Sequence, residues 1–217
     1  MALKIIDLGL VSFPEAYALQ RELFQEVKSG VLDKVLVICR HYPVITCGRS
    51  AKKSNITVSV EELKNKGITI YDVERGGDVT YHGPGQLTVY PVFNLNYLKK
   101  DINWFLRFLE GLIISALSEC GIKGKRRLGL TGVWVGERKI ASIGIAVRNW
   151  ITFHGLSINI KRDDLANFSL IRPCGMDIMI TSVESELGNN ICAEDFKKKF
   201  INTLESSIGS DHAVKVG

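Results

Sequence analysis

Apolar residues recur at every third or fourth position in several parts of the chain, which is the pattern of helices that bury one face. The first such stretch, 16–27, follows a capping box formed by Ser12 and Glu15 and stops at Gly30. A longer stretch follows Asp101, a suitable N-cap residue, and its apolar stripe is typical of a helix that packs on the core. The pattern predicts helices over 12–30, 59–67, 101–120, 182–187 and 193–207.

Runs rich in β-branched and aromatic residues lie between these helices and predict strands. Residues 132–147 also contain a tight turn at Gly136 and Glu137, which is typical of a hairpin. Strands outnumber helices, and hairpins are mixed with helical crossovers. We therefore expect an α+β fold, with mixed sheets and flanking helices, rather than a doubly wound sheet. The predicted strands are 34–40, 68–73, 86–93, the two arms of 132–147, and 151–160, with a further extended piece in 41–48.

Length and composition indicate one folded unit. The chain has 217 residues, 46% of them hydrophobic, and no repeat, low-complexity tract or linker interrupts it. We therefore expect a single domain over 1–217. The formal net charge is +5, and the basic runs are no longer than triplets, so a nucleic-acid-binding tail is not indicated. Such a mild positive charge suits an acidic protein partner or a phosphorylated substrate.

The cysteine pattern and the N-terminal sequence point to a reducing compartment. The number of cysteines is odd and no pair has CxxC spacing, so neither a disulfide framework nor a zinc site is indicated. The N-terminal sequence lacks the apolar run of a signal peptide. The longest predicted helix carries Arg107, Glu110 and Glu119, which exclude a membrane span. These features predict a cytoplasmic protein without a metal site or membrane association.

The stretch RGGDVTYHGPGQ, 75–86, contains four glycines and a proline among its twelve residues, together with Arg75 and His82. Glycine is useful where φ must be positive or where another group approaches the backbone closely. The stretch is therefore either a long loop with a bulge or a backbone cradle around a ligand. It does not open a helix, and the chain contains no GxxxxGK[ST] motif, so a nucleotide site of a familiar type is not supported.

A loop in the last quarter of the chain holds the strongest candidate nucleophile. Cys174 lies in the sequence Arg-Pro-Cys-Gly-Met, where the proline and the glycine fix and expose the backbone. Only the thiolate attacks, so a reactive cysteine needs a group that stabilises its charge or takes its proton. Lys139, in the apolar hairpin, and the histidines at strand ends, His82 and His154, are candidates for this role. From the residues alone, an exposed hairpin lysine and structural histidines remain open as the simpler interpretation.

Several long motifs, taken together and in this order, resemble one family. They are RGGDVTYHGPGQLTVYPV, GVWVGERKIASIGIAV, FHGLSINI and RPCGM, preceded by HYPVITCG. The family that they resemble is the bacterial lipoyl(octanoyl) transferases of lipoate biosynthesis. The resemblance runs from about residue 38 to residue 176.

This resemblance implies the α+β fold shared by biotin and lipoate protein ligases, and an acyl transfer that uses no ATP and no cofactor. The implied donor is octanoyl-acyl carrier protein. The implied acceptor is a specific lysine on the lipoyl domain of a 2-oxoacid dehydrogenase or on the glycine-cleavage H protein. Nucleic acid and membrane are not expected partners.

By motif position, the resemblance gives Cys174 the role of acyl-thioester nucleophile and Lys139 that of its activating partner. His82 becomes a pocket residue and no longer a candidate base. The residues that the resemblance assigns to the acyl and substrate pocket are Arg75, Gly76, Gly77, Asp78, Val79, Thr80, Tyr81, His82, Ser142, Ile143, Gly144, His154, Gly155, Leu156 and Ser157.

Three alternatives stay open at this point. An ATP-dependent lipoate or biotin protein ligase has the same fold but activates a free acid as an adenylate and does not need Cys174. A non-catalytic module would hold an acyl chain or acyl carrier protein without turnover. A Cys/His thiol hydrolase is disfavoured, because neither candidate histidine lies in a known nucleophile–base motif.

Overall fold

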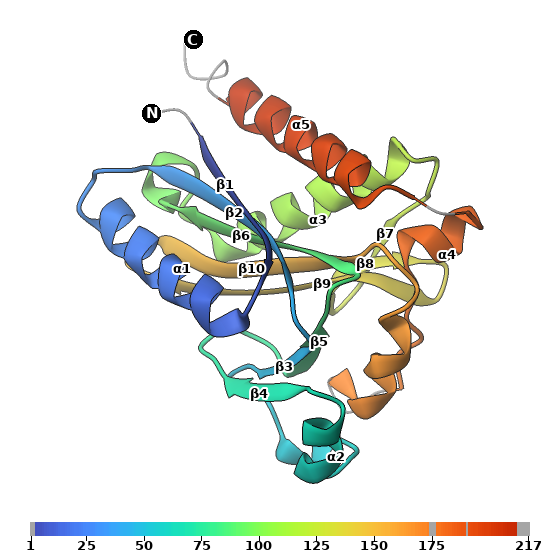
Figure 1. The fold of residues 1–217 in the computed structure, drawn as a ribbon. Coiled ribbons are helices and arrows are strands. Elements are labelled where there is room, and N and C mark those ends of the chain that lie inside the picture. Colours follow the sequence, from blue (N-terminus) through green and yellow to red (C-terminus); the bar gives the residue numbers. More distant parts are fainter. Residues whose placement is uncertain (1–2, 174–176, 190, 212–217) are drawn as a thin grey trace.

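A computed structural model describes residues 3–173, 177–189 and 191–211 of the chain (Figure 1). Its larger sheet has seven strands, and all neighbouring strands are antiparallel except the parallel pair β1–β2. In spatial order the strands are β1 (Lys4–Val11), β2 (Lys34–His41), β6 (Gln86–Phe93), β10 (Ile151–Asn159), β9 (Arg138–Arg148), β8 (Leu130–Val135) and β7 (Lys125–Arg127).

Helices cover both faces of this sheet (Figure 1). On one face lie α3 (Ile102–Ser118) and α5 (Ala193–Asp211), and on the other lies α1 (Phe13–Lys28). Alternate residues of β2 point to opposite faces, so Leu36 packs in the cluster under α3 while Val35 packs in the cluster under α1. The two-sided burial explains why residues 35–39 of β2 are all apolar.

A smaller sheet of three strands lies beside the larger one (Figure 1). Its central strand β3 (Val44–Cys47) pairs in parallel with β4 (Thr69–Asp72) and antiparallel with β5 (Val79–His82). The core of this part also includes residues of α2 (Val60–Asn65) and of the 3₁₀ helix η3 (Leu165–Leu170). The other short elements are the 3₁₀ helices η1 (Lys53–Asn55) and η2 (Leu95–Tyr97), and helix α4 (Val183–Leu187).

Side-chain caps are present at the starts of three helices, and those at Ser12 and Asp101 were predicted. The Ser12 hydroxyl accepts from the Glu15 backbone N–H, and the Glu15 carboxylate accepts from the Ser12 backbone N–H, which completes the capping box of α1. Asp101 caps α3 by accepting from the Trp104 N–H, and Ser59 caps α2 in the same way. The predicted helices and strands therefore all form, with shifts of a few residues at their ends.

Three strands were not expected from the hydrophobic pattern. The stretch 75–86 is not one loop, because β5 forms inside it between two glycine-containing turns. Strands β1 and β7 lie at the two edges of the large sheet, where many side chains face solvent and the apolar signal is weak. Among the described residues, no helix is long and apolar enough to cross a membrane.

Candidate active site

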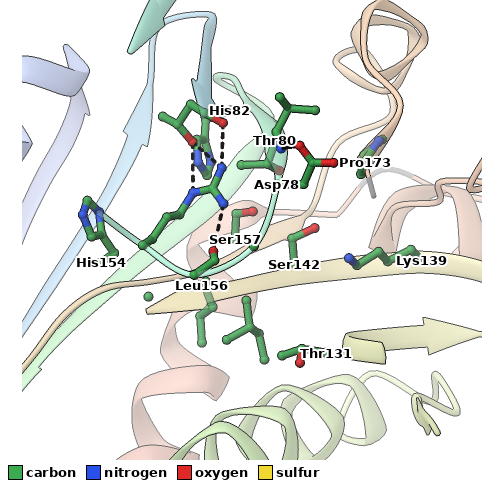
Figure 2. A pocket seen from close by; sticks show the side chains of 18 of the residues that line it. Asp78, Thr80, His82, Thr131, Lys139, Ser142, His154, Leu156, Ser157 and Pro173 are labelled. Atoms are coloured by element: carbon green, nitrogen blue, oxygen red, sulfur yellow. Dashed lines mark hydrogen bonds between the residues drawn. The ribbon is translucent and has the colours of Figure 1, made fainter. Parts of the chain in front are cut away.

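A cavity of about 260 Å³ lies where the glycine-rich stretch crosses the large sheet (Figure 2). Residues 75–80 line one side of it, which we call the roof. Residues 142–144 of β9 and 154–157 of β10 line the other side, which we call the floor. Cross-strand pairs set the floor: Ser142 lies opposite Ser157, and Gly144 lies opposite Gly155. Two strands far apart from the roof in sequence therefore face it in space.

Arg75 fastens the roof to the small sheet. Its Nη2 donates to the Thr46 carbonyl oxygen at 2.6 Å and to Thr46 Oγ1 at 2.9 Å, and its Nε donates to the same hydroxyl at 3.2 Å. Its Nη1 donates to the carbonyl oxygen of Gly76 at 3.1 Å. The side chain is buried, so these bonds are made away from water and hold the loop in one shape.

Glycines allow the roof to lie directly on neighbouring backbone. The Gly76 N–H donates to the Ile145 carbonyl oxygen of β9 at 2.8 Å. A Cβ at Gly144 would lie 2.9 Å from the Gly76 oxygen and 3.0 Å from Arg75 Cδ. At Gly48, a Cβ would overlap the Gly77 carbonyl oxygen. The glycines of this region therefore serve, in part, to bring backbone against backbone.

Asp78 fixes the part of the roof that immediately precedes β5. Its carboxylate accepts from the Val79 N–H at 2.8 Å, from the Lys52 N–H at 3.3 Å and from the Asn55 side-chain amide. The residue is buried, and these donors replace the water that the carboxylate gives up. Asp78 is therefore bound within the fold while it also lines the cavity.

His154 and His82 line the cavity as buried histidines. Burial lowers the pKa of His154 to about 4, although the nearby Glu74 acts in the opposite direction. The His154 ring stacks on Tyr17, with ring centroids 5.4 Å apart, and its backbone has φ of 54°, in the left-handed region. His82 shares a 3.2 Å contact with Gln86 Oε1 through Nδ1, and burial lowers its pKa well below the usual value. Both imidazoles are therefore neutral at neutral pH.

Lys139 lies at the other side of the cavity from His154, with Ser142 between them (Figure 2). It is half-buried, and its ammonium lies 5.3 Å from the centroid of the Trp134 ring. The backbone of Lys139 donates to the Met179 oxygen at 2.8 Å and accepts from the Thr181 N–H at 2.9 Å. The hairpin is therefore bonded to the segment that follows residues 174–176.

Cys174 lies outside the described residues. On its N-terminal side, Pro173 lines the cavity and the Arg172 N–H donates to the Asn55 carbonyl oxygen at 2.7 Å. On its C-terminal side, Ile178 lines the same cavity. The described chain thus borders the cavity both before and after residues 174–176.

Tyr81 is the one predicted pocket residue among those described that does not line the cavity. Its ring packs edge-on against Phe168, and its hydroxyl accepts from the Asn167 side-chain amide at 2.8 Å. On β5 it alternates with Thr80 and His82, so it faces the core of the small sheet while they face the cavity. Tyr81 therefore does not line this cavity, and its role in binding substrate stays a prediction.

Sequence reasoning missed other residues that line the cavity. Trp134 lies opposite Lys139 across the β8–β9 hairpin. The predicted two-residue turn at Gly136 and Glu137 already implies this pairing, because the turn fixes the register of the two strands. Thr46 belongs to the HYPVITCG motif, but its contact with Arg75 depends on tertiary structure. Further lining residues that were not expected are Phe13, Tyr90, Gly129, Leu130, Thr131, Pro173 and Ile178.

Within the part of the chain that the structure describes, no three His, Cys, Asp or Glu side chains are grouped so that they could hold a metal ion.

Comparison with solved structures shows the fold. The chain matches a putative lipoate protein ligase from T. acidophilum with bound lipoic acid with a TM-score of 0.75 at 16% identity, covering 96% of this chain and 87% of that one. It also matches a biotin protein ligase from Aquifex aeolicus with a TM-score of 0.57 at 13% identity, covering 94% of this chain and 69% of that one. The predicted α+β fold of biotin and lipoate protein ligases is therefore confirmed.

Comparison with sequences shows the family. The model of the lipoyl protein ligase A/B catalytic domain matches residues 12–205. An octanoyltransferase of Thermoanaerobacter sp. (strain X514) is 43% identical over 208 residues, which cover 95% of this chain and 90% of that protein. An octanoyltransferase of Clostridium kluyveri is 42% identical over 203 residues, covering 93% and 86%. With its cavity, its fold and these matches, the chain belongs to the octanoyltransferases of the lipoyl protein ligase A/B catalytic-domain family.

Proposed function

We propose that this octanoyltransferase takes its acyl group from octanoyl-acyl carrier protein and transfers it to a lysine of a lipoyl domain. Cys174 carries the acyl group as a thioester between the two steps, and Lys139 is its acid–base partner. Support for this acceptor comes from a solved structure of the same fold, described as an archaeal bi-partite lipoate protein ligase and its E2 lipoyl domain. The net charge of +5 suits acidic protein partners.

One observation carries the residue assignment. Lys139 lines the cavity, and so do Pro173 and Ile178, the described residues that lie nearest in sequence to Cys174 among the lining residues on either side. The backbone bonds between Lys139 and Met179 and Thr181 tie these two parts of the chain together. This arrangement of the flanking residues supports the proposal that Cys174 and Lys139 act together at the cavity.

The floor and roof supply what an acyl group needs. Ile143 and Leu156 give the floor apolar side chains, and the absence of a side chain at Gly144 lets the roof approach it closely. Apolar clefts with a few placed polar groups are typical of small-molecule sites. The neutral states of His82 and His154 suit a buried hydrocarbon chain better than charged imidazoles would.

The chemistry balances without a nucleotide. The Cys174 thiolate attacks the carbonyl carbon of the carrier thioester, and the carrier sulfur leaves with a proton from the Lys139 ammonium. In the second step the neutral Lys139 amine takes a proton from the acceptor lysine as its amine attacks the enzyme thioester, and Cys174 leaves as a thiolate. The first step exchanges one thioester for another, and the second makes a more stable amide, so the sequence runs downhill.

Intact-protein mass spectrometry tests the nucleophile. After incubation with octanoyl-acyl carrier protein, we expect one octanoyl adduct on Cys174 in the wild type and none in Cys174→Ala. The matched control is Cys192→Ala, since Cys192 is exposed and not among the residues that line the cavity. An adduct at another residue, or full transfer by Cys174→Ala, would contradict the assignment.

Alkylation of Cys174 as a function of pH tests the partner. An ammonium beside a thiolate stabilises it, so Lys139→Ala should raise the pH at which iodoacetamide reacts with Cys174. An unchanged profile would show that Lys139 does not activate the thiol. Release of pyrophosphate from ATP with free octanoate would indicate an ATP-dependent ligase instead.

A further inference from the structure

We infer that Trp134 is a positioning residue for this reaction: the face of its indole ring holds the ammonium of Lys139 in place at the cavity. The inference rests on the proposed role of Lys139 and extends it to a residue that does not touch the reacting atoms.

The first support is the register of the hairpin. Trp134 on β8 is the direct cross-strand partner of Lys139 on β9, and both line the cavity. The register shifts between Val133 and Trp134, so the strand is irregular just where the pair forms. The resulting distance between the Lys139 Nζ and the ring centroid is 5.3 Å, within the range of a cation–π contact.

Gly132 provides the space for the lysine side chain. Its φ is +134°, and a Cβ there would lie 2.8 Å from Lys139 Cε and 2.6 Å from the Ala141 oxygen. The same Cβ would lie 3.3 Å from the tip of the Trp134 ring. The Gly132 N–H donates to Glu110 Oε1 at 3.1 Å, which fixes this part of the strand. The end of the lysine stem and the tip of the indole ring therefore both lie close to the Gly132 backbone.

Burial makes the ring a rigid support. Only 1% of Trp134 is exposed, so its position is set by packing. Lys139, in contrast, has four side-chain torsions and a large rotamer entropy. A fixed ring that attracts the ammonium narrows this freedom before any substrate arrives.

The indole N–H of Trp134 makes no hydrogen bond within the described part of the chain, so the ring face is the part of the side chain that can act on Lys139. Nε1 is buried and has no hydrogen-bond partner among the described residues. A buried donor without a partner destabilises the folded state, and phenylalanine would avoid this cost. Tryptophan nevertheless offers the strongest π face to a cation. The Arg127 guanidinium also lies over this ring, at 5.9 Å, so the ring attracts positive charge from two strands.

Two substitutions separate the ring face from simple packing. Trp134→Phe keeps a smaller π face, whereas Trp134→Leu keeps an apolar side chain and removes the face. We expect kcat for octanoyl transfer to fall by about threefold to thirtyfold in Trp134→Leu and by less in Trp134→Phe, with KM for the octanoyl carrier nearly unchanged. The pH of half-maximal Cys174 alkylation should rise in the same order.

The matched control is Trp104→Leu, because Trp104 lies on α3 in a stack of aromatic rings with Phe108 and does not line the cavity. It should lose stability without any change in the alkylation profile. Circular dichroism and thermal unfolding show which variants are folded, and Trp134→Phe alone decides the question if Trp134→Leu does not fold.

The outcomes distinguish this inference from the proposed function. If Lys139→Ala changes the alkylation profile while folded Trp134 variants keep the wild-type profile and kcat, the positioning role of Trp134 is wrong and the role of Lys139 stands. If Lys139→Ala changes neither quantity, both are overturned. If the profile shifts in the order wild type, Trp134→Phe, Trp134→Leu, the positioning role is supported.

Discussion

At the scale of single residues, Arg75 shows how a buried charged side chain can hold the wall of a cavity in place. Its guanidinium donates to both oxygens of Thr46 and to the backbone of Gly76. Such a fork of donors suits fixed acceptors on two segments at once, which a lysine cannot match. The residue therefore holds the roof over the floor.

We expect Arg75→Lys to lower the free energy of unfolding by about 2–3 kcal/mol, because a single ammonium cannot satisfy the acceptors that the guanidinium reaches. It should also raise KM for the octanoyl carrier, since the roof is less firmly held. Urea unfolding and initial-rate kinetics measure the two effects. Arg21→Lys, at an exposed position of α1, is the control. Equal stability of Arg75→Lys and wild type would show that the roof does not depend on this side chain.

The residues of the candidate site were predictable where a motif contained them, and the direction of each side chain was not. Cys174, Lys139 and the glycines follow from motifs. Tyr81 lies in the same motif but faces the core of the small sheet, because the glycine-rich stretch contains strand β5, in which successive side chains point to opposite faces. The glycines and the proline of this stretch conceal that strand in the sequence. The place of Trp134 beside Lys139 follows only from the pairing register of the hairpin, and not from a motif.

At the scale of elements, Glu110 joins helix α3 to the hairpin that carries Lys139. It is fully buried on α3 and accepts from Arg126 Nε at 3.0 Å, from Arg107 Nη1 at 2.6 Å and from the Gly132 N–H at 3.1 Å. The last bond reaches the irregular part of β8. Helix α3 thus anchors strand β8, whose Trp134 contacts the Lys139 side chain.

Glu110→Ala should lower the free energy of unfolding by about 2–4 kcal/mol, because it leaves the buried Gly132 N–H without an acceptor and separates two arginines from their charge partner. Glu110→Gln, which keeps an acceptor for Gly132, should lose about half as much. Chemical unfolding of both variants beside Glu22→Ala, an exposed glutamate of α1, gives the comparison. A Glu110→Ala variant as stable as the control would contradict this role.

Elements with a strong apolar period were predictable, whereas edge elements were not. Helix α3 and strand β6 follow from their hydrophobic pattern and boundaries. Strand β7 consists of Lys125, Arg126 and Arg127 and has no apolar pattern. An edge strand pairs on one side only, and the side chains of β7 largely face solvent. The pairing order of the strands depends on long-range contacts that no local pattern contains.

At the scale of the whole molecule, three buried histidines link stability to pH. Burial lowers the pKa of His41 and of His154 to about 4, and lowers that of His82 well below its usual value. In the unfolded chain each imidazole has a pKa of about 6.5. The folded state therefore keeps them neutral at pH values where the unfolded state takes up protons.

The free energy of unfolding should be greatest above about pH 6.5 and should fall as the pH drops from there toward 4. With up to three extra protons bound by the unfolded chain, the slope should approach about 4 kcal/mol per pH unit. The carboxylates with lowered pKa values add to this only near and below their ordinary range. Urea unfolding at several pH values tests the slope.

His41→Gln should reduce that slope by about one proton, and it should also destabilise the protein at pH 7, because the Tyr90 hydroxyl loses a partner 2.7 Å away. A stability that does not change between pH 7 and pH 5 in the wild type would rule out this linkage.

The connections between the two sheets have a consequence for substrate binding. Strands β2 and β3 are separated only by Tyr42 and Pro43, and β5 and β6 only by residues 83–85. The roof is bonded to the large sheet at Ile145 and to the small sheet through Arg75. A cavity held at so many points is preorganised, so the entropy of shaping it is lost during folding and not at each encounter with an acyl carrier. For the proposed acyl site, we therefore expect the fixed volume to set the accepted chain length, with longer chains refused at binding and not at the chemical step.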